Sequence, residues 1–130
     1  MLVKVYFEDT DAGGVVYHSN YLKYAERART EILRSIGYNQ KDLLNENIVF
    51  VIVKASVSFI KPARLDDELL VETEITAIKK ASLVFVHRIY LEKTLLVEVI
   101  ANVACLYFDS FKIRKIPAQL ITRLSKFKQS

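Results

Sequence analysis

The stretch Glu8-Asp-Thr-Asp-Ala-Gly-Gly-Val-Val-Tyr-His-Ser-Asn-Tyr-Leu-Lys-Tyr-Ala-Glu-Arg-Ala-Arg-Thr-Glu-Ile-Leu-Arg-Ser-Ile-Gly37 joins an acidic, glycine-containing turn to a long amphipathic segment. From Tyr21 onward, apolar residues recur at every third or fourth position, which predicts a helix of about four turns with one apolar face. The helix is expected to have Ser19 or Asn20 as its N-cap and Gly37 just past its end. The positions predicted to face solvent are Lys23, Glu26, Arg27, Arg29, Glu31 and Arg34.

Segments on both sides of this helix have the composition and alternation of β-strands. They are residues 2–7 before the turn, and residues 49–60, 69–78, 82–91 and 95–108 after a short helical turn or loop at 38–47. The connections at 79–81 and 92–94 have hairpin length, so the last three strands are expected to run antiparallel in sequence order. Pro117 and the apolar spacing after it predict a short C-terminal helix. The order predicts an α+β fold in a single domain, residues 1–130, with the long helix against a twisted antiparallel sheet.

The composition is that of a small globular protein with an excess of apolar residues. Hydrophobic residues make up 52% of the chain, and the long strands leave edges that one helix cannot cover, so we expect a subunit interface at a sheet edge. The longest apolar run, residues 48–53, is too short to cross a bilayer, and no signal-peptide core is recognisable. We therefore expect a cytoplasmic protein. The single cysteine, Cys105, lies in an apolar segment and is expected to be buried and inert.

Positive charge is concentrated near the C-terminus. The formal net charge is +4, and residues 110–130 contain no acidic residue. The basic residues there are Lys112, Arg114, Lys115, Arg123, Lys126 and Lys128. Such a cluster can contact nucleic acid, membrane lipid or a phosphorylated cofactor, but the solvated face of a helix is the commoner interpretation. We expect no nucleic-acid partner, and a peripheral lipid contact stays an alternative.

The acidic turn does not have the spacing of a metal-binding loop. Counted from Asp9 as a calcium loop, it has Gly13 at the fifth position and Asn20 at the twelfth, where a bidentate glutamate is required. The two histidines, His18 and His87, and the lone cysteine have no zinc-ligand spacing. We therefore expect no metal site.

A carboxylate on a glycine-containing turn directly before a helix is suited to acyl transfer. Unpaired N–H groups at the helix start can polarise a carbonyl oxygen while the carboxylate attacks the carbon or activates a water. Gly13 and Gly14 permit close approach of a substrate to the backbone, and His18 is placed to orient the water or the leaving group. A purely conformational role, in which Asp9 or Asp11 ends the strand and caps the turn, fits the same residues. The pattern alone leaves both interpretations open.

The string from Glu8 to Leu22, followed by Tyr24-Ala-Glu-Arg-Ala-Arg29 and Glu31-Ile-Leu-Arg34, resembles the hotdog-fold acyl-CoA thioesterases. Within them it resembles the YbgC type associated with the Tol–Pal system, and it is more distantly similar to the 4-hydroxybenzoyl-CoA thioesterases. The similarity continues more loosely through residues 59–69 and the strands. It implies a hotdog fold, in which a five-stranded antiparallel sheet wraps around one long helix, with a short C-terminal helix added. It also implies hydrolysis of acyl-CoA thioesters to free acid and CoA.

The resemblance also implies roles for individual residues. The catalytic carboxylate falls on Asp11, as nucleophile or general base, the histidine of this subgroup falls on His18, and a backbone N–H at about His18 polarises the thioester. The expected substrate-binding residues are Gly13, Gly14, Tyr17, Asn20, Tyr21, Lys61, Arg64, Lys79 and Lys80, of which the four basic residues are assigned to the CoA phosphates from their places at strand ends and turns. No cofactor is expected beyond the CoA of the substrate. Active sites are expected between the subunits of a homodimer or homotetramer.

Other residues are expected to be structural. His87 lies outside the motif and is expected to be partly buried with a hydrogen-bond partner. Tyr17, Tyr21 and Tyr24 fit an acyl tunnel, but the core is the commoner place for helix aromatics. The alternative function is a hotdog module that binds acyl-CoA or a protein partner without turnover, because the fold alone does not separate the two.

Overall fold

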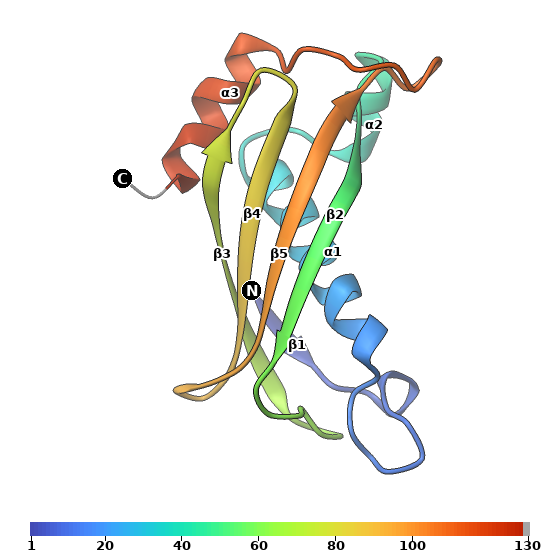
Figure 1. The fold of residues 1–130 in the computed structure, drawn as a ribbon, viewed down its shortest axis with the longest axis vertical. Coiled ribbons are helices and arrows are strands. Elements are labelled where there is room, and N and C mark those ends of the chain that lie inside the picture. The colour runs from blue at the N-terminus through green and yellow to red at the C-terminus, as the bar shows by residue number, and fades with distance from the viewer. Residues whose placement is uncertain (129–130) are drawn as a thin grey trace.

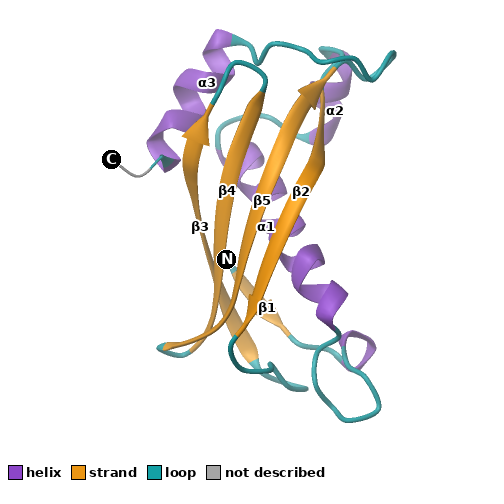
Figure 2. Cartoon of the chain, viewed as in Figure 1, coloured by secondary structure: helices purple, strands orange, loops and turns teal. Residues whose placement is uncertain are grey.

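Five strands form one antiparallel sheet, and one long helix lies across a face of it (Figure 1). The structure, a computed structural model, describes residues 1–128. The strands are β1 (Leu2–Lys4), β2 (Val49–Phe59), β3 (Glu68–Ile78), β4 (Ser82–Leu91) and β5 (Thr94–Leu106), the helices are α1 (His18–Ser35), α2 (Gln40–Asn45) and α3 (Ala118–Leu124), and the short 3-10 helices are η1 (Phe7–Asp9) and η2 (Ser125–Phe127). The predicted α+β architecture is confirmed, with α2 and α3 at one end of the sheet (Figure 2).

The strand order across the sheet is β1-β3-β4-β5-β2. The meander predicted for β3, β4 and β5 is confirmed, because each strand pairs antiparallel with the next. The chain then departs from sequence order: β2 pairs with β5, and the short β1 pairs with β3. The two edges of the sheet are therefore β1 and β2.

Apolar side chains on the inner face of the sheet pack against one face of α1. Ala25 and Ala28 are buried there, and their small side chains let the helix backbone approach the sheet. Toward the start of α1 the core contains Tyr21, Tyr24, Leu69, Ile89, Val97 and Val99, and toward its end Ile32, Leu33, Phe85, Cys105, Leu120 and Leu124. Cys105 is fully buried, as predicted, and burial raises the pKa of its thiol.

The end of α1 is fixed by α3. Gly37 has φ +94°, a left-handed conformation that favours glycine, just past the helix as predicted. The Arg123 guanidinium donates to the carbonyl oxygen of Ile36 at 3.0 Å and lies over the Tyr38 ring. Arg123 of the basic C-terminal segment therefore supports the last turn of α1, where a cation is favoured by the helix dipole.

The β2 edge is largely uncovered in a single subunit. The α1 helix packs mainly on β3 and β5, and β2 exposes Val53 to 66% and Phe59 to 49%. A register shift between Ile52 and Lys54 interrupts its pairing with β5. An exposed apolar edge strand is available for pairing with another chain.

Three predicted boundaries are wrong. The last strand, predicted to end at residue 108, ends at Leu106. The first strand ends at Lys4, because Phe7–Asp9 turns into a 3-10 helix in which the Tyr6 N–H donates to the Asp9 carboxylate at 2.9 Å. The long helix begins at His18, so neither Ser19 nor Asn20 is its N-cap. Within the described residues 1–128, no helix is both long and apolar enough to cross a membrane.

Candidate active site

The turn that leads into α1 is closed by backbone hydrogen bonds. Thr10 and Val16 form an isolated antiparallel bridge, and the Asp11 N–H donates to the Val15 carbonyl at 2.9 Å. Gly14 takes φ +79°, which completes the turn without the strain that a larger residue would meet. The turn therefore holds Asp11 in a fixed place before the helix.

The Asp11 carboxylate folds back onto its own turn. Its Oδ1 atom accepts hydrogen bonds from the N–H groups of Gly13, at 2.8 Å, and Val15, at 3.3 Å. Gly13 leaves room for this contact, since a Cβ there would lie 3.3 Å from Oδ1. Among residues 1–128 no hydrogen-bond donor contacts Oδ2. One carboxylate oxygen is thus anchored, and the other is available to a reactant.

Asp9 uses both of its oxygens within the structure. Oδ1 accepts from the Asn20 side-chain amide at 2.7 Å, and Oδ2 accepts from the backbone N–H of Tyr6. Asn20 is buried on the first turn of α1, so its amide nitrogen is committed to Asp9. Asp9 therefore ties the acidic turn to the helix.

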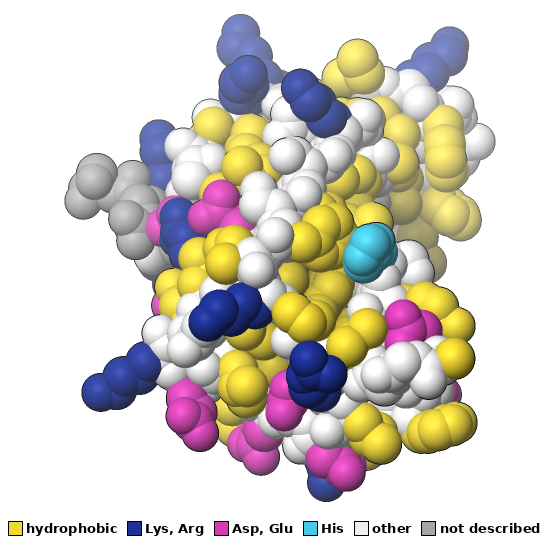
Figure 3. Space-filling model, turned by 60° about the horizontal axis from the view of Figure 1, so that its bottom comes forward, with side chains coloured by type: hydrophobic (Ala, Val, Ile, Leu, Met, Phe, Trp, Pro, Cys, Tyr) yellow, Lys and Arg dark blue, Asp and Glu magenta, His cyan; other side chains and the backbone are white. Residues whose placement is uncertain are grey.

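The start of α1 borders a small cavity of about 200 Å³. No side chain of the described chain caps the helix, and the Asn20 N–H donates to the Tyr17 carbonyl at 3.0 Å. The N–H groups of His18 and Ser19 stay available to an acceptor. The cavity is lined by Val15, Val16, His18, Tyr21, Phe59, Ile60, Lys61 and Pro62. The imidazole of His18 lies against the Phe59 ring with 4.5 Å between centroids. Figure 3 shows the lower face of the molecule, where a band of hydrophobic side chains borders a histidine.

Tyr21 and Tyr24 are core residues, each 1% exposed, whereas Tyr17 is half exposed. The Tyr21 hydroxyl accepts a hydrogen bond from the Ala63 N–H at 3.0 Å, and its ring also forms part of the cavity wall. Burial raises the pKa of Tyr24, and the negative charge of Asp9 raises it further. Tyr21 is thus tied to the β2–β3 connection, whereas the buried Tyr24 hydroxyl has no hydrogen-bond partner within the described residues.

The structure separates the basic residues that were assigned to CoA. Lys61 lines the cavity. The backbone of Arg64 forms an isolated antiparallel β-bridge with Val15 of the turn. Lys79 and Lys80 lie in the β3–β4 connection, at the opposite end of the sheet from the start of α1 (Figure 1). Within one subunit they are not near Asp11, because their assignment rested only on their place in a turn.

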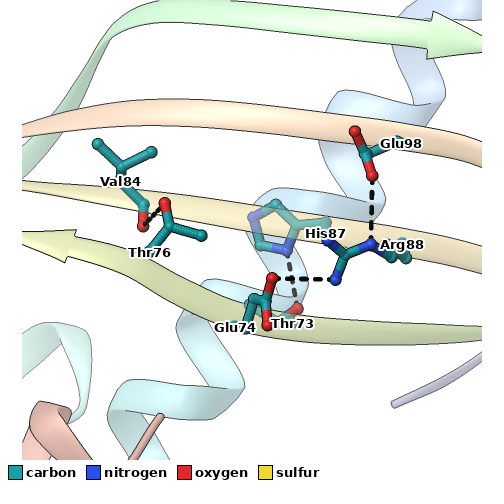
Figure 4. A network of polar contacts seen from close by, with 7 residues as sticks. All are labelled: Thr73, Glu74, Thr76, Val84, His87, Arg88 and Glu98. Atoms are coloured by element: carbon teal, nitrogen blue, oxygen red, sulfur yellow. Dashed lines mark hydrogen bonds and ion pairs between the residues drawn. The ribbon is translucent and has the colours of Figure 1, made fainter. Parts of the chain in front are cut away.

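His87 is fully buried, more than predicted, and has two polar partners. Its Nδ1 lies 2.8 Å from the Thr73 hydroxyl, as Figure 4 shows, and its Nε2 lies 3.1 Å from Arg29 Nη1. Burial lowers the pKa of His87 to about 3, and the charge of Arg29 lowers it further. On the opposite face of β4, Arg88 pairs with Glu74 at 3.0 Å and with Glu98 at 3.2 Å (Figure 4).

Sequence reasoning missed two residues of this region. Arg29 was expected to face solvent but is only 8% exposed, because its guanidinium reaches across to His87 on the sheet. Phe59 was treated only as a strand residue, although it packs against His18. The helical spacing could not reveal either contact, since both join residues far apart in the sequence.

Comparison with known proteins identifies the family. Residues 13–98 match the sequence model of the Thioesterase superfamily. The chain belongs to this superfamily. A Probable Thioesterase from Bartonella henselae has the same fold, with a TM-score of 0.86 and 31% identity over 90% of this chain and 97% of that chain. The hotdog fold expected from the sequence is thereby confirmed.

Named thioesterases match about half of the chain at high identity. The Acyl-CoA thioester hydrolase YbgC of Escherichia coli O157:H7 is 54% identical over 71 residues, which are 55% of this chain and 53% of that protein. The Acyl-CoA thioesterase YbgC of Helicobacter pylori is 49% identical over 74 residues, 56% of this chain and 53% of that protein. The matched stretch spans about half the length of these curated relatives.

Proposed function

We propose that this chain hydrolyses acyl-CoA thioesters to a carboxylic acid and CoA, in the cytoplasm and without a cofactor beyond the CoA of the substrate. Membership of the Thioesterase superfamily and the names of the YbgC relatives support the reaction class. The observation that carries the proposal is the placement of Asp11, which is anchored through one oxygen on the turn that leads into the uncapped start of α1, although Asp11 itself does not line the cavity there.

Asp11 acts in this scheme as general base or as nucleophile. As a base, it takes a proton from a water molecule while the water oxygen attacks the thioester carbon. As a nucleophile, Oδ2 forms the bond to carbon, and water then cleaves the resulting anhydride. In both routes the C–S bond breaks, and the departing CoA thiolate takes up a proton.

The helix start and His18 complete the scheme. The N–H groups of the first turn of α1 hold the carbonyl oxygen as it becomes negative, and the helix dipole adds to this stabilisation. His18, on the cavity wall beside Phe59, orients the water or the leaving thiolate. Lys61 and Arg64, next to the site, contact the CoA phosphates.

Replacement of Asp11 tests this function. Asp11→Asn keeps the shape and removes the charge, and we expect it to lower the rate of CoA release by about 10²–10⁴-fold. Asp109→Asn, at an exposed aspartate outside the site, is the matched control and should retain the wild-type rate. Released thiol is measured with a chromogenic reagent, which the buried Cys105 does not disturb. Equal rates in Asp11→Asn and wild type would refute the assignment.

The exposed β2 edge supports a two-fold dimer in which the β2 strands of two copies pair antiparallel. Val53→Lys places a charge in the middle of that contact and should lower the molar mass in sedimentation equilibrium. Leu2→Lys is the control, because Leu2 is also 66% exposed but lies on the opposite edge strand, β1. An unchanged mass for Val53→Lys, or the same loss for Leu2→Lys, would contradict this arrangement.

A binding module without turnover has the same fold and is the second candidate. It would be supported by thermal stabilisation of the protein by acyl-CoA without release of thiol. The Oδ2 atom of Asp11, which no donor of the described residues contacts, meets a requirement of the enzyme but fits a turn aspartate as well, so thiol release decides between the two.

A further inference from the structure

Asn20 bonds to both ends of the turn that carries Asp11, the blue turn at the lower end of the molecule in Figure 1. Its side-chain amide donates to Asp9 Oδ1 at 2.7 Å, and its backbone N–H donates to the Tyr17 carbonyl at 3.0 Å. The two ends are also joined directly, because the Tyr17 N–H donates to the Asp9 carbonyl at 3.0 Å. The base of the turn is therefore closed around one residue of the first turn of α1.

The two arms of this turn are held in different ways. The second arm, residues 14–16, is attached by backbone hydrogen bonds to the β2–β3 connection. On the first arm, residues 9–11 form their other hydrogen bonds within residues 6–17. Within the described chain, the bond between Asn20 and Asp9 is thus the one hydrogen bond that joins the first arm to the body of α1.

Asn20 lies beneath the turn and not in the cavity at the start of α1. It is 7% exposed, and it does not line that cavity, whereas His18 and Tyr21 of the same helix do. The amide of Asn20 is also already used by Asp9. Within one subunit, Asn20 therefore has no contact with the space that borders the helix start, and any effect it has on a reaction there must pass through Asp9.

We propose that Asn20 positions Asp11 for catalysis by holding Asp9 against the first turn of α1. The inference rests on the proposed hydrolase function. The reaction needs the Asp11 carboxylate and the N–H groups of His18 and Ser19 at the same thioester carbonyl, and the Asn20–Asp9 bond fixes the arm that carries the carboxylate relative to those N–H groups. A misplacement of about 1 Å at a reacting group can slow a reaction by about 10²-fold.

Removal of the amide tests the positioning role. Asn20→Ala is compared with Leu120→Ala, which removes a buried side chain of α3 and destabilises the fold without touching the turn. Each variant is assayed where circular dichroism shows it folded, with acetyl-, hexanoyl- and dodecanoyl-CoA. We expect Asn20→Ala to lower kcat by about 10–10²-fold while KM changes by less than about twofold, because only the alignment of the reacting groups is lost. Leu120→Ala should keep the wild-type kcat.

Exchanging the two side chains separates positioning from the mere loss of an amide. In the double variant Asp9→Asn with Asn20→Asp, the amide at position 9 donates to the carboxylate at position 20, and its oxygen still accepts from the Tyr6 N–H. Asn20→Asp alone brings two carboxylates together, and Asp9→Asn alone lacks an acceptor for one of the two donors. Each single change should lower kcat by about tenfold or more, and the double variant should return to within about threefold of wild type. A double variant as slow as the product of the two single effects would overturn the proposal.

Hydrogen exchange follows the turn without any substrate. The Asp11 N–H donates to the Val15 carbonyl inside the turn, so its exchange reports local opening there. The rate should rise by about tenfold in Asn20→Ala, return toward wild type in the exchanged double variant, and stay unchanged in Leu120→Ala. Faster exchange in Asn20→Ala with an unchanged kcat would mean that the bond holds the turn without serving the reaction, which overturns the positioning role.

The outcomes also separate this inference from the proposed function. An active wild type with the same kcat in Asn20→Ala, or with a change in KM alone, overturns the role of Asn20 and leaves the hydrolase standing. A wild type that hydrolyses none of the three acyl-CoA substrates refutes the hydrolase, and the positioning role with it, even where exchange in the turn depends on Asn20. A lowered kcat that the exchanged double variant restores supports both.

Discussion

Replacing His87 with glutamine should remove an acid-dependent loss of stability from the folded protein. In the folded state, burial and then the charge of Arg29 lower the pKa of His87 to about 3, whereas the unfolded value is about 6.5. Between these values the unfolded chain binds a proton at this residue and the folded chain does not. Stability that is fully present above pH 6.5 is therefore lost progressively as the pH falls toward 3.

The magnitude follows from the two pKa values. Each pH unit below 6.5 lowers the free energy of unfolding by about 1.4 kcal/mol, so the loss from His87 at pH 5 is about 2 kcal/mol. Glutamine does not titrate, yet its oxygen can accept from Arg29 and its amide can donate to Thr73. Between pH 7.5 and pH 5, the free energy of unfolding of His87→Gln should thus fall by about 2 kcal/mol less than that of wild type.

Urea unfolding at several pH values measures this difference. Circular dichroism is the suitable signal, because the chain contains no tryptophan. Thr73→Val is the matched control, because it removes the hydrogen bond to Nδ1 but keeps the imidazole. Its free energy of unfolding should be lower than that of wild type at every pH, but it should change with pH as steeply as in wild type. Parallel curves for His87→Gln and wild type would refute the conclusion that His87 is held neutral in the fold.

Three further substitutions test the packing around α1, each followed by the free energy of unfolding in urea. Gly37→Ala should cost about 1–2 kcal/mol, because φ is +94° and the new Cβ would lie 3.2 Å from Arg123 Nη1; an unchanged midpoint would exclude this strain. Tyr21→Phe leaves the buried Ala63 N–H without its acceptor and should cost about 1–3 kcal/mol, and a neutral result would mean that the bond is dispensable. Leu120→Ala should cost about 2–5 kcal/mol if α3 is docked through this side chain, whereas exposed Gln119→Ala should cost little.

The fold could be predicted from local patterns because its elements are long and regular. The alternation in β3 and the helical spacing of α1 each reflect a single buried face, and the two hairpin connections are only three and two residues long. The start of α1 could not be located, because the sequence offers two good capping residues, Ser19 and Asn20, whereas the helix begins earlier without a side-chain cap. A side-chain cap stabilises a helix start by only about 1 kcal/mol, so the backbone hydrogen bonds that close the turn before His18 decide where α1 begins.

The candidate site was predictable in its local part only. Asp11 and His18 are close in sequence, so the local backbone of the acidic turn determines most of their relative placement. Phe59 reaches the site through the pairing of β2 with β5, and Arg29 turns inward because His87 lies on the facing strand. Contacts of this kind depend on tertiary packing, which neither spacing nor composition records.

The hydrogen bonds of Ala63 limit how the site can open. Its N–H donates to the Tyr21 hydroxyl, and its carbonyl accepts from the Val16 N–H at 2.9 Å, so one buried residue locks the β2–β3 connection to both the turn and α1. The start of the helix therefore cannot move away from the sheet without breaking the Tyr21 bond, and the turn cannot move without breaking the Val16 bond. Local opening should be most frequent at the exposed tip of the turn, residues 12–13. In hydrogen exchange, the Ala12 amide should exchange early and the Val16 amide late, because only the Val16 N–H is bonded to the buried Ala63 carbonyl.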